Sequence, residues 1–257
     1  MSDVSASAVA SLRARTGVSM MECQKALTEA EGDEEKAIDI LRSKGEAQAV
    51  KKADREQGEG YIFSKSDDGK VAIILLKCET DFVSRGDDFQ AFGNGLAELA
   101  FNEGEEAVRN ADDKINEAVQ KMGENITLGD VNVVEGETIG CYVHTNGKIG
   151  VVITLKGGSA ELARDVAMHA AAMNPLYISP DDVPADVVER ETVIWKQQLK
   201  SEGKPEEIME KILIGKEKKF REENALLKQE FVKNPEQTIE QYLGDANVDS
   251  YLRLSVV

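Results

Sequence analysis

The spacing of apolar residues along the chain predicts a mixture of strands and helices. Residues 71–76 form a continuous apolar run of strand length, reading Val-Ala-Ile-Ile-Leu-Leu. After this run, apolar side chains recur at three- and four-residue steps, as on one face of a helix: Phe89, Phe92, Leu96 and Leu99. The first unit that the pattern predicts is therefore a strand that leads into a helix.

The strand patterns occur twice, as two copies of one β-hairpin. In the first copy, residues 61–65 and 71–77 flank a polar turn. In the second copy, residues 141–144 and 149–156 flank another polar turn. Both turns contain Gly-Lys, both second strands end in Leu-Lys, and a helical pattern follows each. The chain thus contains an internal repeat.

The two copies also close alike, with strand-like stretches at residues 131–134 and 251–256. Each half is expected to hold three strands with helices on one face, which is an α+β arrangement. We assign the first half to residues 56–138. The second half takes residues 139–183 and 226–257.

Residues 1–55 are expected to form a small domain of three helices. Gly17 ends the first helix, because glycine readily adopts the left-handed conformation. Ser19 begins a capping-box pattern that opens the second helix. Gly45 ends the third helix, and residues 46–53 continue as a separate short helix. So small a unit presents a surface rather than encloses a site.

The turn after the first helix is unusually apolar for a loop. It contains Val18, Met20 and Met21. These side chains either pack on a neighbouring part of the chain or are kept for a partner. Adaptable methionines suit both roles, and the local sequence leaves both open.

Residues 184–225 predict an antiparallel helical hairpin inserted into the second half. Four residues of the first helix recur at three- and four-residue steps, as on one helix face: Val188, Thr192, Trp195 and Leu199. Gly203 and Pro205 then stop one helix and begin another, which continues through Ile208, Ile212 and Phe220. The charged run at residues 216–219 is typical of a solvated face. A partner or dimer surface is the alternative.

The copies differ in the link between strand and helix. The first copy takes about twelve residues from Lys77 to its first helical apolar position, Phe89, whereas the second takes about six from Lys156 to Leu162. The additional residues hold Thr80-Asp81-Phe82-Val83. A link longer than closure requires is a favoured place for function. The alternative is that Phe82 and Val83 return to the core.

Charge and composition narrow the class of protein. The chain of 257 residues carries 31 basic and 48 acidic residues, for a formal charge of −17. Such a charge repels phosphate backbones, so direct binding of nucleic acid is not expected. No apolar run approaches the length of a membrane span, and no targeting signal is recognised, so we expect a cytoplasmic protein. Three widely spaced cysteines indicate reduced thiols rather than disulfides or zinc ligands.

The sequence offers no constellation for catalysis. It lacks a phosphate-binding P-loop, a dinucleotide-binding glycine motif and a metalloprotease motif. His169 is expected to be a partly buried helix residue. A nucleophilic set of Cys78, Asp81 and His144 is conceivable but lacks support from spacing. We therefore predict a binding protein rather than an enzyme, with no catalytic residue, metal or cofactor.

Three stretches of this sequence resemble bacterial translation elongation factor Ts: residues 16–27, 78–83 and 167–169. The resemblance covers nearly the whole chain, in order. It implies a guanine-nucleotide exchange factor for elongation factor Tu, with an N-terminal ubiquitin-associated-like domain, two related core subdomains and an inserted coiled-coil hairpin. A ubiquitin-associated-like adaptor or chaperone is the alternative. An enzyme that uses carboxylates of the two halves is a third.

The resemblance also implies roles for individual residues. Asp81 and Phe82 of the motif Thr80-Asp81-Phe82-Val83 would enter the partner's GTPase domain near its magnesium and nucleotide site. Thr80 and Val83, which flank them, are expected to bind the partner as well. A second set would grip a helix of the same domain: Leu12, Arg13, Val18, Met20 and Met21. A third set would touch domain 3 of the partner: His144, Phe231 and Val232. Family members often carry a basic pair where this chain has Leu128-Gly129, so no contact is carried over to these two positions.

The family binds elongation factor Tu in its GDP-bound and nucleotide-free forms, and we expect the same of this chain. A dimer of factor Ts–factor Tu pairs is left open.

Overall fold

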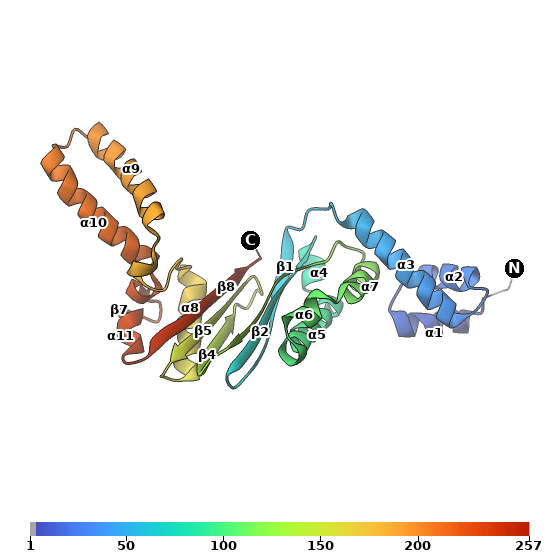
Figure 1. Cartoon of the computed structure of the whole chain (residues 1–257). Coiled ribbons are helices and arrows are strands. Elements are labelled where there is room, and N and C mark those ends of the chain that lie inside the picture. Colours follow the sequence, from blue (N-terminus) through green and yellow to red (C-terminus); the bar gives the residue numbers. More distant parts are fainter. Residues whose placement is uncertain (1–3, 257) are drawn as a thin grey trace. The chain divides into compact units, whose positions relative to one another are not determined.

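The computed structural model describes residues 4–256, apart from the side chains of residues 46–50 and 207 (Figure 1). The chain forms two compact units. Unit 1 contains Met1–Val134, Val143–Gly150 and Leu254–Val257. Unit 2 contains Glu135–Tyr142 and Val151–Arg253. The domain boundaries that we expect from the sequence stay predictions.

Unit 1 begins with three helices, α1 (Ala6–Thr16), α2 (Met20–Glu29) and α3 (Glu34–Lys52). The backbone of Gly17 is left-handed, with φ of 68°, and ends α1 as predicted. The Ser19 side chain accepts a hydrogen bond from the Glu22 N–H and caps α2. Buried apolar residues of all three helices form one cluster: Val9, Leu12, Val18, Cys23, Ala26, Leu27, Ala30, Ala37 and Leu41.

The prediction that Gly45 ends the third helix is wrong, because α3 continues through it to Lys52. Gly45 is buried against helix α7 (Asp112–Met122). A Cβ at position 45 would lie 3.1 Å from Gln120 Oε1 and 3.4 Å from the Asn116 carbonyl oxygen. The glycine therefore permits two helices to approach closely, and the sequence pattern alone does not distinguish this use from a helix stop.

The first sheet has the strand order β1-β2-β3, from β1 (Glu59–Asp67), β2 (Lys70–Cys78) and β3 (Thr127–Glu135). Strands β1 and β2 are antiparallel and pair Asp67 with Lys70, so Asp68 and Gly69 form the predicted turn. Gly69 has φ of 80°, a conformation that favours glycine in two-residue hairpin turns.

Four helices lie along the chain between β2 and β3: α4 (Asp81–Ser84), α5 (Asp87–Glu103), α6 (Glu105–Arg109) and α7. Their apolar sides pack on alternate residues of the hairpin and form a buried core. Phe63, Ile74 and Leu76 contribute from the strands, and Phe89 and Leu96 contribute from α5. The apolar run at residues 71–76 and the helical spacing after it are thus both confirmed.

The second sheet has the order β4-β5-β8, from β4 (Thr138–Val143), β5 (Ile149–Lys156) and β8 (Asn247–Ser255). Helix α8 (Ala160–Met173) follows β5, and Ser159 caps it by accepting the Leu162 N–H at 3.2 Å. A short hairpin, β6 (Glu230–Phe231) and β7 (Asn234–Thr238), leads into α11 (Ile239–Leu243). The predicted α+β class, with two similar three-stranded sheets, is confirmed.

Helices α9 (Ala185–Ser201) and α10 (Glu206–Asn224) form the hairpin of unit 2, which Figure 1 shows in orange. Gly203 has φ of 71° and Pro205 precedes α10, as the sequence predicts. The rings of Trp195 and Phe220 lie 5.6 Å apart, edge to face. Ile208 is 49% exposed, and its neighbour Met209 is buried instead.

Two short 3-10 helices flank this hairpin in the chain, η1 (Pro180–Asp182) and η2 (Leu226–Lys228). The Arg221 guanidinium of α10 donates to the carbonyl oxygens of Pro180 and Val183 at 3.2 and 3.0 Å. The base of the hairpin is therefore fastened to the segment from which α9 begins.

Candidate functional site

The additional residues of the first copy form a single helical turn, α4, between strand β2 and helix α5. Thr80 has an extended backbone and caps this turn, since its Oγ1 accepts the Val83 N–H at 3.3 Å. The turn ends at Arg85 and Gly86, before α5 begins at Asp87. The predicted link is thus a short ordered helix and not an irregular loop.

Within this turn, one apolar side chain faces outward and one faces inward. Phe82 is 86% exposed, more than any other exposed large apolar residue of the described chain. Val83 packs against the core of unit 1, and Ser84 is buried. The alternative that both apolar residues return to the core therefore holds for Val83 only.

The strand exit before the turn is held by the carboxylate of Glu124, which follows α7. Glu124 Oε2 accepts the backbone N–H groups of Glu79 and Thr80 at 3.0 and 3.1 Å. Glu124 Oε1 accepts the Thr80 hydroxyl at 2.6 Å. Sequence reasoning did not identify Glu124. No local pattern signals it, because its partners lie 44 and 45 residues away in the chain.

The other end of the turn is also held. The Gln90 side-chain amide donates to the Ser84 carbonyl oxygen at 2.6 Å, and Ser84 Oγ donates to the Asp81 carbonyl oxygen at 3.1 Å. Arg85 pairs with the Asp81 carboxylate at 3.5 Å. An isolated helical turn is unstable in water, so these contacts are what order it.

Beside Phe82 lies a shallow depression of about 500 Å³. Apolar and acidic side chains share its lining: Phe82, Val83, Asp87, Asp88, Phe89 and Met122, with Gly86. Lys121 Nζ pairs with Asp88 at 2.7 Å on this side of α7. The exposed ring thus stands on a rim that combines apolar surface with carboxylates.

The predicted residues of the N-terminal helices divide into surface and core. Met20 and Met21, at the start of α2, are 44% and 64% exposed, and Arg13 is exposed on α1. Leu12 and Val18 are buried in the core of the three helices. Direct contact of these two residues with a partner therefore does not fit the structure, in which they support the surface from beneath.

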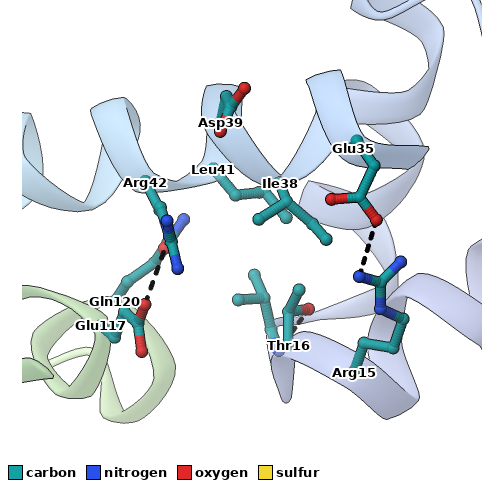
Figure 2. Close-up of a pocket in the computed structure, with 10 residues that line it drawn as sticks. Arg15, Thr16, Glu35, Ile38, Asp39, Leu41, Arg42, Glu117 and Gln120 are labelled. Atoms are coloured by element: carbon teal, nitrogen blue, oxygen red, sulfur yellow. Dashed lines mark hydrogen bonds and ion pairs between the residues drawn. The ribbon is translucent and has the colours of Figure 1, made fainter. Parts of the chain in front are cut away.

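A cavity of about 370 Å³ lies between α1, α3 and α7 (Figure 2). Two ion pairs lie in its lining: Arg15 binds Glu35 at 2.8 Å, and Arg42 binds Glu117 at 3.5 Å. Thr16 Oγ1 donates to the Leu12 carbonyl oxygen. Its lining residues include no cysteine or histidine, and nothing in the cavity indicates a reactive centre.

In unit 2, Val232 is 40% exposed while the preceding Phe231 is buried. The Phe231 ring stacks on Tyr242 with centroids 4.3 Å apart, so its predicted contact with a partner does not fit the structure either. His169 Nδ1 accepts the Val232 N–H at 3.3 Å, which leaves Nε2 to donate to Gln229 Oε1 at 3.0 Å. His169 is fully buried, where partial burial was expected. Burial lowers the pKa of its imidazole.

His144, in unit 1, follows β4 and is exposed. Its backbone N–H donates to the Ile149 carbonyl oxygen at 2.9 Å, and its own carbonyl oxygen accepts the Gly147 N–H at 2.7 Å. These bonds close the second predicted turn and place the imidazole at its edge.

The thiol of Cys78 lies at the end of β2, next to the strand exit. Burial, reinforced by the charge of Glu124, raises the pKa of the Cys78 thiol to about 12, which keeps it protonated and unreactive. Among the side chains that the structure describes, no group of His, Cys, Asp and Glu is placed to hold a metal ion. Every helix in the described part of the chain is too short or too polar to span a bilayer.

The structure exposes one aromatic ring on a braced helical turn and, elsewhere in unit 1, two methionines at the start of α2, which are features of the class of proteins that act through contact surfaces. The family model described as "Elongation factor TS" matches residues 79–256. This chain belongs to the elongation factor Ts family of translation factors.

Similar full-length relatives support this assignment. "Elongation factor Ts" of Marinobacter nauticus is 47% identical over 265 aligned residues, covering 100% of this chain and 92% of the relative. The protein of the same name from Francisella tularensis subsp. novicida is 44% identical, covering 100% of this chain and 93% of the relative. That from Hydrogenovibrio crunogenus is 45% identical, covering 98% and 91%.

Proposed function

We propose that this chain is a guanine-nucleotide exchange factor, which promotes GDP release from elongation factor Tu in the cytoplasm. Family membership supports the exchange role, and the 86% exposure of Phe82 carries the assignment of the site. In the proposal the ring of Phe82 enters the partner near its nucleotide and magnesium site, with Asp81 as the accompanying polar contact. Thr80 and Val83 hold these two residues in place.

The mechanism needs no covalent chemistry, cofactor or metal of its own. A factor that binds the disrupted nucleotide site better than the loaded site lowers the affinity of the partner for GDP. By the same amount, bound GDP lowers the affinity of the partner for the factor. Burying one phenylalanine side chain contributes about 1.5–3 kcal/mol. Since about 1.4 kcal/mol is a tenfold change in affinity, one ring can supply a useful share of that coupling.

The second contact in the proposal is the exposed surface at the start of α2 and on α1, formed by Met20, Met21 and Arg13. His144 and Val232 are proposed to meet domain 3 of the partner. Both are exposed, which such a contact requires.

The proposed partner is elongation factor Tu, both GDP-bound and nucleotide-free. The assembly is either one pair or a dimer of pairs, which light scattering of the mixture distinguishes. Because the chain carries a formal charge of −17, the proposal includes no direct contact with nucleic acid.

The test is stopped-flow release of labelled GDP from elongation factor Tu at saturating factor. Phe82→Ala should slow stimulated release by roughly 30-fold, because truncating an aromatic anchor costs about 2 kcal/mol or more. Phe82→Leu, which keeps an apolar side chain, should slow stimulated GDP release less than Phe82→Ala does. Both variants should have the melting temperature of the parent, since the exposed ring of Phe82 contributes little to the core. Unchanged release with Phe82→Ala would reject the site and would instead favour an adaptor that docks passively.

A further inference from the structure

The carboxylate of Glu124 connects three hydrogen-bond donors at the exit of strand β2. The donors are the Glu79 N–H, the Thr80 N–H and the Thr80 hydroxyl, at 3.0, 3.1 and 2.6 Å. All three belong to the two residues directly before α4. Bonds to an ionised acceptor are among the stronger hydrogen bonds in proteins, so this contact restrains the backbone where the turn begins.

The bond to the Thr80 hydroxyl also sets the helix cap. A hydroxyl has one proton to donate, and the Thr80 proton is directed to Glu124 Oε1. Its oxygen lone pairs are then available to the Val83 N–H, which lies 3.3 Å away. Glu124 therefore selects the side-chain orientation in which Thr80 caps α4, and the direction of α4 determines where Phe82 points.

Residues 79–80 and residues 124–125 exchange hydrogen bonds, with donors on both segments. Glu79 Oε1 accepts the Asn125 N–H at 2.7 Å, while the Glu79 N–H is given to Glu124. The Asn125 side-chain amide donates to the carbonyl oxygens of Ala53 and Arg55 at 3.3 and 3.0 Å. Residues 124–125 are thus fastened to the rest of unit 1 and form a firm base for the strand exit.

The second copy of the fold shows that closure does not require such a brace. There, β5 leads to α8 through Ser159, which caps the helix by itself without an intervening turn. Of the two strand-to-helix links, only the first contains the additional turn. The bonds of Glu124 are therefore directed at that turn.

We propose that Glu124 is a positioning residue for exchange: it fixes the cap of α4 and so holds Phe82 in the orientation that enters the partner. This inference rests on the proposed function and extends it to a residue that need not touch the partner. If so, loss of the Glu124 carboxylate should slow stimulated GDP release by reducing the contribution of Phe82. It should not slow release independently of Phe82.

The first test is Glu124→Gln, which keeps the size of the side chain but replaces one acceptor oxygen by a donor amide. Stimulated GDP release at saturating factor should fall about 5-fold or more. Amide hydrogen exchange at Glu79 and Thr80 in the free protein should become faster. Glu103→Gln, an exposed site at the end of α5, is the matched control and should change neither quantity.

A double-mutant cycle separates positioning from general damage. In a Phe82→Ala background, Glu124→Gln should slow release by less than about 2-fold, because the ring that it positions is gone. An equal loss in both backgrounds would overturn the proposal. If Glu124→Gln does not fold, Thr80→Val removes the hydroxyl bond from the other side and enters the same cycle.

The outcomes also separate this inference from the proposed function. If Phe82→Ala leaves release unchanged, the proposed exchange site fails and the inference fails with it as a statement about exchange. The brace itself is read independently from amide exchange in the free protein. Unchanged protection of Glu79 and Thr80 in Glu124→Gln would overturn the positioning role even where the exchange site stands.

Discussion

Gly93 of α5 lies directly against the ring of Phe63 in β1, where a Cβ at position 93 would come within 2.1 Å of Phe63 Cε2. Phe63 also lies 5.9 Å, between ring centroids, from Phe89, one turn earlier on α5. Helix α5, which follows the Phe82 turn, thus packs on the sheet at Gly93. This close approach fixes how near α5 comes to the hairpin.

Gly93→Ala should destabilise the protein by about 1–3 kcal/mol, the usual cost of adding a methyl group to a filled core. The matched control is Gly95→Ala on the same helix, where nothing lies within 4 Å of the added Cβ. That variant should be stabilised by about 0.5–1 kcal/mol, because alanine favours a helix over glycine. Urea unfolding of both variants measures the difference, and equal effects would contradict the packing explanation.

Met20→Ala and Met21→Ala should weaken affinity for elongation factor Tu more than they slow exchange at saturating factor. Both side chains are exposed at the start of α2, whereas in our proposal Phe82 is the residue that enters the partner near its nucleotide. Each truncation is expected to raise the concentration of factor needed for half-maximal stimulation by roughly 5- to 10-fold, equivalent to about 1–1.4 kcal/mol. Titrating each variant against labelled GDP release gives both quantities.

Leu12→Ala serves as the contrast for this surface, because Leu12 is fully buried beneath it. It should lower the melting temperature, as expected for a core truncation of about 2–5 kcal/mol. Equal losses for Met21→Ala in affinity and in the saturated rate would count against a purely docking role.

His169 should make the stability of unit 2 sensitive to mild acid. Burial lowers the pKa of its imidazole below the usual value of 6.5, so the folded protein favours the neutral ring. Below about pH 6.5 the unfolded chain binds more protons at this residue, and stability therefore falls as the pH falls toward the folded pKa. Above that range this contribution to stability is fully present.

His169→Gln removes the titrating ring and should flatten the fall in melting temperature between about pH 7.5 and about pH 5.5. His144→Gln is the control, because it changes the other histidine of the chain, which is exposed. An unchanged pH profile in His169→Gln would show that other groups are responsible. Loss of the Val232 N–H bond should also lower the stability of His169→Gln at neutral pH.

Several parts of the fold were predictable because their signals are local. Asp68-Gly69 lies between two strand patterns, and Gly203 and Pro205 lie between two helical patterns, so each turn is encoded within a few residues. The apolar run at residues 71–76 reports its strand directly. The motif around Phe82 was also visible, since comparison of the two copies exposed the longer link.

Other conclusions could not be reached because a local pattern does not determine what surrounds a residue. Gly45 carries the signal of a helix stop, yet α7 packs against it and the helix continues. Leu12, Val18 and Phe231 share an apolar character with Met21 and Val232, but only the latter two are exposed. Apolar character alone does not distinguish core from contact surface.

The main strands of the two sheets, the repeat of the hairpin and the family could be identified from the amino-acid sequence, because periodicity, turn residues and motifs are written in consecutive positions. That Phe82 points outward and that Glu124 braces its turn emerged only from the folded chain. Those facts depend on residues 44 positions apart meeting at one strand end. Hydrogen-bond geometry of that kind arises only when the chain has folded.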